Sequence, residues 1–181
     1  MKIYLLLILI GLLSGCSSKQ KERIVLQPDD YLNKLKTLQL DPTKYTSYKN
    51  YCASIDKKMI DWLNQIDSPT QLEKLFWSCH KINKTTPESQ DQLQWIQPFS
   101  ESKNLILYRL ANIKTPESAK ILVDLWTNPT AGWDASAGER ATDAVVQLGK
   151  LTLPYLKKKK RDKKRISDVI TLIESGAKTA F

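Results

Sequence analysis

The chain has 181 residues and a formal net charge of +9, and this length suffices for one domain with a hydrophobic core. The charge is unevenly placed, because residues 157–165 carry eight basic side chains and one acidic side chain, a net of +7. This distribution excludes a uniformly basic surface and favours one place of contact.

The N-terminus has the order of an export signal. An apolar run of 11 residues, Ile3 to Leu13, follows Lys2 and leads through small residues to Cys16. A membrane-spanning helix needs about 20 apolar residues, so this run is too short to cross a bilayer. A basic start, an apolar middle and small residues predict a secretory signal with a cleavage site. An ordinary buried N-terminal helix is the alternative.

The segment Leu13-Ser14-Gly15-Cys16 resembles the lipobox of bacterial lipoproteins. The resemblance implies that residues 1–15 are a cleaved signal peptide and that Cys16 carries fatty acids. Two or more acyl chains anchor a protein stably to a membrane. The next residue is Ser17 and not Asp, which by resemblance to lipoproteins of two-membrane bacteria favours the outer membrane, facing the periplasm.

Residues 16–29 are expected to form the lipidated cysteine and a tether with a turn at Pro28-Asp29, and residues 30–181 an α-helical domain. Apolar residues then recur every three or four positions, which predicts a short helix through Leu38 and a second from about 43 to 66. Ser68-Pro69-Thr70-Gln71 is expected to begin a third helix, with a serine cap and a capping-box glutamine.

Two identical helix starts follow, Thr86-Pro87-Glu88-Ser89 and Thr115-Pro116-Glu117-Ser118. The first predicts a helix that stops before Pro98, with a separate helix from about Leu105 to Ile113. The second predicts a helix that stops near Pro129. Later apolar stripes predict helices that end at Gly149 and Gly176, separated by a short helix and a turn at Arg161-Asp162. No segment alternates like a strand, so the predicted class is all-α.

The segment Ala144-Val145-Val146-Gln147-Leu148-Gly149, then Leu153-Pro154-Tyr155-Leu156, a turn aspartate and a helix with Arg165, resembles HEAT-type repeats. The resemblance covers about residues 104–176. It implies a compact α-α helical repeat domain with a concave binding face, and therefore an interaction protein.

Cys52 and Cys79 lie on apolar stripes of two helices that should pack as a hairpin. An even pair in an oxidising compartment predicts a disulfide, which would stabilise by roughly 3.5 kcal/mol. Their heights in the hairpin differ by about 7 Å, so two buried free thiols are the alternative. Adjacent helical residues diverge by about 100°, so Cys79 and His80 cannot form a nucleophile–base pair. One histidine and two cysteines give no zinc spacing, and no metal or cofactor is expected.

Four carboxylates near the second half of the chain, Asp124, Asp134, Glu139 and Asp143, belong to no recognisable catalytic motif. A hydrolase pair of acid and nucleophile is one interpretation, and solvated helix faces are the other. We therefore expect no enzyme activity.

The basic run is the sharpest surface feature, and its side chains are Lys157, Lys158, Lys159, Lys160, Arg161, Lys163, Lys164 and Arg165. Anionic lipid, an envelope glycan or an acidic protein would bind such a patch, and each charge near an anionic membrane contributes about 1 kcal/mol. Export and the lack of aromatic residues within the run argue against nucleic acid. A solvated cap on a terminal repeat is the alternative.

The stretch from Thr127 to Glu139 is expected to be the longest break between helices, and long loops in compact domains are often functional. Trp133 and Asp134 are the candidate partner-binding residues in it. The alternative is that Trp133 folds back onto the core.

These observations predict a membrane-anchored, all-α lipoprotein of the cell envelope that acts as a non-enzymatic adapter or scaffold for a protein complex. The alternatives are a binder of anionic lipid or envelope polymer through residues 157–165, and an envelope hydrolase.

Overall fold

The computed structural model describes residues 26–38, 48–85, 90–133, 135–159 and 162–176. The side chains of 48–52, 83–85, 90–97 and 135–136 lie outside this description. The described ranges contain helices and no strand, which confirms the all-α prediction. The helices are α2 (Pro28–Lys36), α3 (Tyr48–Leu63), α4 (Pro69–Thr85), α5 (Gln90–Ile113), α6 (Pro116–Trp126), α7 (Ala135–Leu148), α8 (Leu153–Leu156) and α9 (Lys163–Ser175), with 3-10 turns η2 (Pro129–Ala131) and η3 (Gly149–Leu151).

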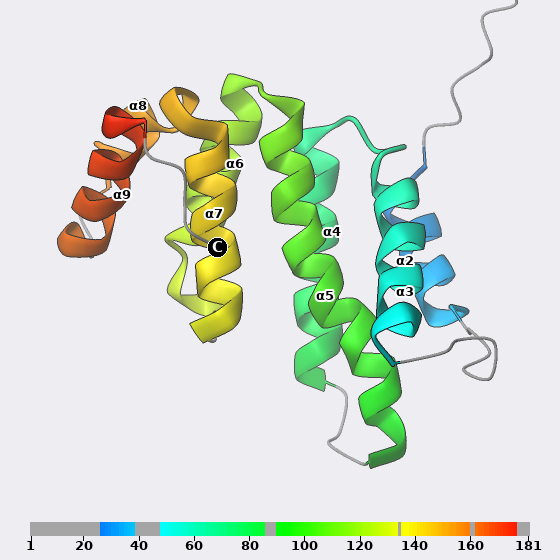
Figure 1. The fold of residues 1–181 in the computed structure, drawn as a ribbon. Coiled ribbons are helices and arrows are strands. Elements are labelled where there is room, and N and C mark those ends of the chain that lie inside the picture. Colours follow the sequence, from blue (N-terminus) through cyan, green and yellow to red (C-terminus); the bar gives the residue numbers. More distant parts are fainter. Residues whose placement is uncertain (1–25, 39–47, 86–89, 134, 160–161, 177–181) are drawn as a thin grey trace, which may run out of the picture.

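The helices pair into hairpins that stack in two layers. Each hairpin joins consecutive helices, α2 with α3, α4 with α5, α6 with α7, and α8 with α9. Helices α2, α4, α6 and α8 pack in sequence to form the first layer, and α3, α5, α7 and α9 form the second layer. Figure 1 shows α2 and α3 at one end of this stack and α8 and α9 at the other.

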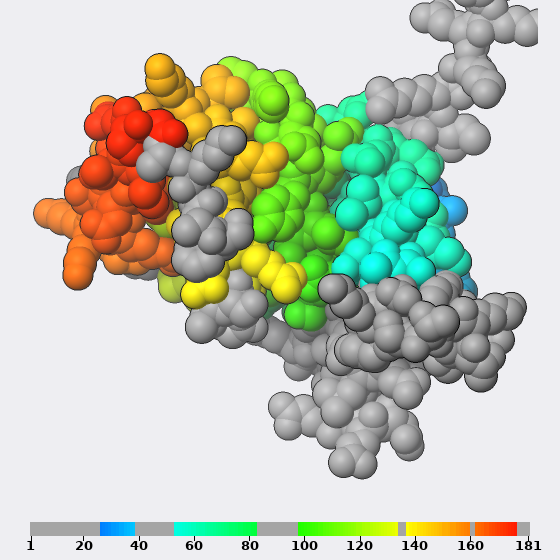
Figure 2. Space-filling view, viewed as in Figure 1, coloured from blue at the N-terminus to red at the C-terminus, as the bar shows by residue number. Residues whose placement is uncertain are grey.

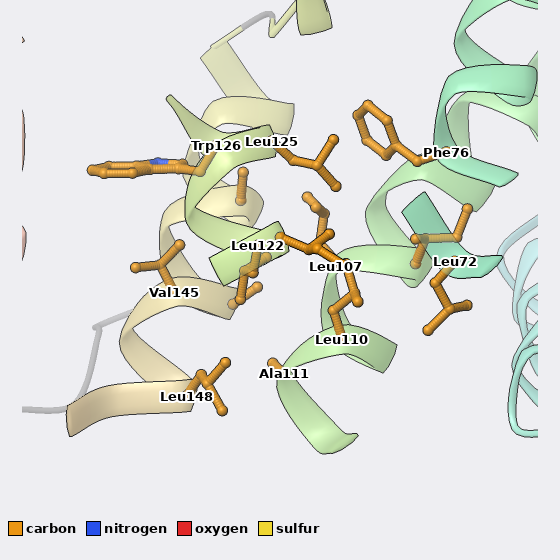
Figure 3. Packing of buried hydrophobic residues seen from close by; sticks show 14 of the residues in the cluster. Leu72, Phe76, Leu107, Leu110, Ala111, Leu122, Leu125, Trp126, Val145 and Leu148 are labelled. Carbon is orange, nitrogen blue, oxygen red and sulfur yellow. The ribbon is translucent and has the colours of Figure 1, made fainter. Parts of the chain in front are cut away.

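The core lies between the two layers and runs through the stack as one cluster of buried side chains (Figure 3). Each hairpin contributes to it because its apolar residues recur at helical spacing on the facing sides. Complete burial of one such leucine contributes roughly 1.5–3 kcal/mol. The labelled members are Leu72, Phe76, Leu107, Leu110, Ala111, Leu122, Leu125, Trp126, Val145 and Leu148.

The domain begins earlier than the sequence predicted. Pro28 and Asp29 form the first turn of α2, so the expected turn at this position is wrong. A proline at the first helical position loses no hydrogen bond and has a preset φ, which favours the helix start. Leu26 is buried, and Gln27 Oε1 accepts a hydrogen bond from Gln71 Nε2 at 3.0 Å. The folded body therefore includes the last residues assigned to the tether.

Two predicted helix caps are present. Ser68 Oγ accepts a hydrogen bond from the Gln71 backbone N–H at 3.3 Å, but the Gln71 side chain reaches Gln27 and so does not complete a capping box. Thr115 and Ser118 form a reciprocal box, in which each side-chain oxygen accepts from the other backbone N–H. The matching start at residues 86–89 lies outside the described residues.

Pro98 does not end a helix, and the predicted break before it is wrong. It lies inside α5, which runs unbroken from Gln90 to Ile113. A proline inside a helix removes one hydrogen bond and costs about 3 kcal/mol. The helix continues because residues beyond the proline are buried against neighbouring helices, Phe99, Ile106 and Leu107 among them. The Ser102 hydroxyl also donates to the Pro98 carbonyl at 2.6 Å.

The C-terminal half follows the predicted stops but has a shorter loop. Gly149 and Gly176 follow helix ends as predicted, and their φ values of +63° and +69° are left-handed, as expected for Gly149. Asp162, expected in a turn with Arg161, has φ of +49° and precedes α9, and Arg161 lies outside the described residues. Because α7 begins at Ala135 and η2 covers Pro129–Ala131, the break expected from 127 to 139 is shorter than predicted.

Candidate interaction surface

The predicted lipidation site lies outside the described residues, as does all of the signal peptide. Attachment of fatty acids at Cys16 therefore stays a prediction. Among the helices that the structure describes, none is both long enough and apolar enough to span a bilayer.

Cys79 is a fully buried free thiol. Burial raises its pKa to about 12, and the positive charge of Lys103 opposes that shift. Cys79 thus forms no disulfide in the structure, and the expected hairpin of these two helices is wrong, because α3 pairs with α2 and α4 pairs with α5. The side chain of Cys52 lies outside the described part of the chain.

Among the described residues of the basic run, three side chains make contacts within the protein. Lys157 Nζ pairs with Glu174 at 2.9 Å, and Lys159 Nζ pairs with Asp124 at 2.6 Å. The Arg165 guanidinium lies 4.5 Å from the centre of the Trp126 ring and donates to Gly138 O and Thr142 Oγ1, both at 3.3 Å.

Lys159 and Arg165 therefore hold the last hairpin to α6 and α7, whereas Lys157 pairs with Glu174 inside the last hairpin. Lys158, Lys163 and Lys164 are exposed, and Lys160 and Arg161 lie outside the described residues. The sequence did not reveal this division because the partners of the described side chains, Glu174, Asp124 and Trp126, lie far from the run in sequence or on other helices.

Asp124, one of the carboxylates singled out in the sequence, lies between two lysines, with Lys120 Nζ at 2.9 Å and Lys159 Nζ at 2.6 Å. Burial alone would raise the pKa of Asp124. The hydrogen bonds and charges of the two lysines outweigh that effect and hold the pKa below its ordinary value. Asp124 is thus a structural tie between α6 and the basic run.

Trp133 folds onto the core, as the alternative interpretation described. Its ring packs against Phe76 with centroids 5.5 Å apart, and its Nε1 donates to Leu125 O at 3.2 Å. Asp134 lies outside the described residues. The loop that carries Trp133 is therefore anchored, and the half-buried indole does not project as a free contact.

The anchor includes a buried lysine that the sequence analysis missed. Lys103 is 7% exposed, and its Nζ donates to Ala131 O at 2.9 Å and lies 3.4 Å from His80 Nδ1. The ammonium also lies over the rings of Phe76 and Trp133, at 5.3 and 5.2 Å from their centroids, where cation–π attraction favours it. A sequence signal existed, because position 103 falls on the apolar stripe that continues through 106, 107 and 110.

A row of polar side chains follows the contact between α5 and α7 in the second layer. At one end Arg140 Nη1 donates to both carboxylate oxygens of Glu101, at 2.7 and 2.9 Å. At the other end Gln147 Nε2 donates to Asn112 Oδ1 at 3.0 Å. The neighbouring surfaces of α3, α5 and α7 lie side by side in Figure 2.

The middle of the row is acidic. Burial raises the pKa of Asp56 on α3, and the negative charge of Glu101 adds to the shift while Arg140 opposes it. Burial likewise raises the pKa of Tyr108, and the charge of Asp143 adds to that shift. The charges of Glu101 and Arg140 affect the pKa of both Asp56 and Tyr108, so both groups lie near this ion pair.

Two oxygen atoms in the same row have no hydrogen-bond partner within the described part of the chain. They are Asn104 Oδ1 and Asp143 Oδ1, and both are buried. The Asn104 amide reaches Glu101 through Nδ2 at 3.4 Å, which leaves its oxygen unused. A buried acceptor without a donor costs about 1–3 kcal/mol. Because this cost is recovered when a donor arrives, the polar row of α5 and α7 is the best candidate for a recognition site.

No group of three or more His, Cys, Asp or Glu within the described ranges could hold a metal ion. A scan against models of protein families, a search of curated proteins and a search of solved structures each found no match for this chain.

Proposed function

We propose that this protein is a lipid-anchored adapter of the bacterial cell envelope that binds a protein partner through the second layer of its helical stack. The observation that carries the proposal is the polar row between α5 and α7, which ends in the paired Glu101 and Arg140 and contains acceptors without donors. Such a row on rigid helices suits recognition of another protein, since helical positions hold side chains more precisely than loops do.

The lipid anchor in this proposal depends on the N-terminal sequence, Lys2, the apolar run and Leu13-Ser14-Gly15-Cys16. Because Leu26 belongs to the folded body, the tether shortens to residues 17–25, which reach at most roughly 30 Å when extended. An outer-membrane position facing the periplasm rests on Ser17 after the cysteine.

The stacking of hairpins in two layers supports the resemblance to HEAT-type repeats. In such stacks each hairpin contacts only its neighbours, and the extended surface of one layer binds partners. The polar row lies on the second layer, near the middle of the stack. We therefore move the proposed partner contact from the Trp133 loop to α5 and α7, because Trp133 serves as an anchor.

A second candidate function is binding of an anionic envelope polymer by the last hairpin. The exposed side chains Lys158, Lys163 and Lys164 favour it. This hairpin lies at the opposite end of the stack from α2, the helix nearest the tether (Figure 1). Its lysines therefore lie at the end of the stack far from α2. This position favours binding of a polymer over binding of the membrane that holds the anchor.

Site-specific photocrosslinking on intact membranes tests the adapter proposal. Tyr108 is replaced by a photoreactive phenylalanine analogue in the full chain, and the matched control carries it at exposed Lys74 on α4 of the first layer. We expect a discrete protein adduct from position 108, none from position 74, and loss of both the adduct and membrane retention in Cys16→Ala. Equal labelling from both positions, or no adduct from position 108, contradicts the adapter proposal.

A further inference from the structure

Asn104 and Asp143 lie at the same level of the α5–α7 contact. The Glu101–Arg140 pair fixes the register of the two helices. One turn further along, this register brings Asn104 of α5 opposite Asp143 of α7, and each has one buried oxygen that accepts no hydrogen bond from the described residues. Asn104 itself is only 7% exposed, so this acceptor belongs to a built interior position.

The charges around these oxygens favour a cation. Asp143 has no ion-pair partner among the described residues, whereas the guanidinium of Arg140 is already shared with Glu101. Asp56 adds another carboxyl, which leaves three acids to one arginine in a chain whose net charge is +9. A neutral donor would satisfy the two oxygens but would leave the Asp143 charge unpaired. A cationic donor both donates hydrogen bonds to the two oxygens and pairs with the charge of Asp143.

We propose that the partner protein inserts an arginine or lysine side chain between Asp143 and Asn104. This inference deepens the proposed function and rests on it for the class of partner. A guanidinium or ammonium donates charge-assisted hydrogen bonds to both oxygens. Tyr108, one turn beyond Asn104 and half-buried, supplies an aromatic surface for the aliphatic stem. Because the two oxygens are buried, neighbouring side chains move as the cationic side chain enters.

Peptide binding to the full lipidated chain in detergent tests the inference without a known partner. The probes are dye-labelled, terminally blocked tri-arginine, tri-lysine and tri-citrulline, measured by fluorescence anisotropy at about 0.15 M salt to screen weak surface attraction. We expect binding of one or both cationic peptides and none of the neutral citrulline isostere. The difference between the arginine and lysine probes identifies the preferred head group.

Asp143→Asn should weaken binding of the cationic peptide at least tenfold. The matched control, Asp168→Asn, removes an exposed acid on α9 and should change it less than twofold. Arg140→Gln provides a change of opposite sign, because it removes the local positive charge and frees Glu101, and it should tighten binding. Circular dichroism shows whether each variant is folded. If Asp143→Asn is unfolded, the change in peptide binding by Arg140→Gln tests the inference alone.

Any of three results overturns the inference. The first is equal weakening of cationic-peptide binding by Asp143→Asn and Asp168→Asn. The others are citrulline-peptide binding as tight as that of the cationic peptides, and unchanged cationic-peptide binding in Arg140→Gln. These outcomes are separable from the adapter proposal. If position 108 still gives a crosslinked partner while the cationic peptides do not bind, the adapter proposal stands and the cationic side chain is wrong.

Discussion

Arg165 lies over the ring of Trp126, with its guanidinium carbon 4.5 Å from the ring centre, and so joins the last helix to the third hairpin. Its Nη2 also donates to Gly138 O and Thr142 Oγ1 on α7. The Trp126 indole N–H donates to the same Thr142 hydroxyl at 3.0 Å. Burial lowers the pKa of Arg165, with the charge of Asp162 opposing the shift. The contact therefore fixes the basic run from its C-terminal side.

We predict that Arg165→Ala destabilises the protein by about 1–2 kcal/mol, because it removes the cation–π contact and two hydrogen bonds. Arg165→Lys should recover less than half of this loss, since an ammonium neither stacks nor donates as a fork. Lys164→Ala at the exposed neighbouring position is the control and should change stability by less than about 0.5 kcal/mol. Urea unfolding measures all three, and equal effects at positions 164 and 165 contradict the prediction.

Gly132 provides a second test, because its backbone and its surroundings both restrict the residue. Its φ is +66°, and an added Cβ would lie 3.2 Å from His80 Cε1. Gly149 has a similar φ of +63° with no atom within 4 Å of the added Cβ. Both alanine variants incur left-handed strain of about 1 kcal/mol. Only Gly132→Ala should also crowd the histidine and disturb the anchored loop.

Thermal unfolding should therefore rank Gly132→Ala below Gly149→Ala. Combining Gly132→Ala with His80→Ala should remove the extra loss, since the crowded ring is gone, although His80→Ala has its own cost. A double-mutant cycle isolates the interaction free energy between the Cβ added at position 132 and the His80 ring. Additive effects of the two substitutions would mean that the approach to His80 has no energetic consequence.

Cys79 should be unreactive in the folded protein. Burial favours the neutral thiol and raises its pKa from 9.0 to about 12. In a Cys52→Ala background, a disulfide reagent at pH 8 should label Cys79 at least a hundredfold more slowly in buffer than in denaturant. The thiolate is the nucleophile, and the buried side chain is out of reach. Fast labelling of the folded chain would contradict the described burial.

The same shift gives a pH dependence. Above pH 9 the unfolded chain loses the thiol proton while the folded chain keeps it until about pH 12, so the thiol lowers stability as pH rises through this window. Relative to Cys79→Ala, the Cys79 protein should therefore lose stability between pH 8 and pH 10. A difference that stays constant with pH would show that ionisation of Cys79 does not contribute.

Apolar spacing predicted most of the fold because the core depends on it. The stripes through Leu72, Phe76, Leu110 and Val145 are the residues that the two layers bury, and short capping motifs marked helix starts. These signals are local in sequence, so they can be read without knowledge of neighbouring helices. The apolar stripes and capping motifs therefore predicted the all-α fold class and most helix positions.

The candidate site could not be predicted in the same way. Glu101 and Arg140 meet across 39 positions, and the register of α5 against α7 follows from packing along the whole stack. The contacts made by the basic run could not be predicted for a related reason. Its lysines look equivalent in sequence, but Glu174 and Asp124 reach only those that face them.

Pro98 shows how packing overrides a local signal, and its substitution measures the balance. The proline has no N–H for the carbonyl four residues earlier, yet α5 continues through it. Pro98→Ala should restore that hydrogen bond and stabilise the protein by about 1–2 kcal/mol, after the larger entropy of the unfolded chain is subtracted. Pro116→Ala is the matched control. It lies in the first turn of α6, where no hydrogen bond is missing, so alanine should destabilise by about 0.5–1 kcal/mol. Urea unfolding gives both values, and the prediction requires that they differ in sign.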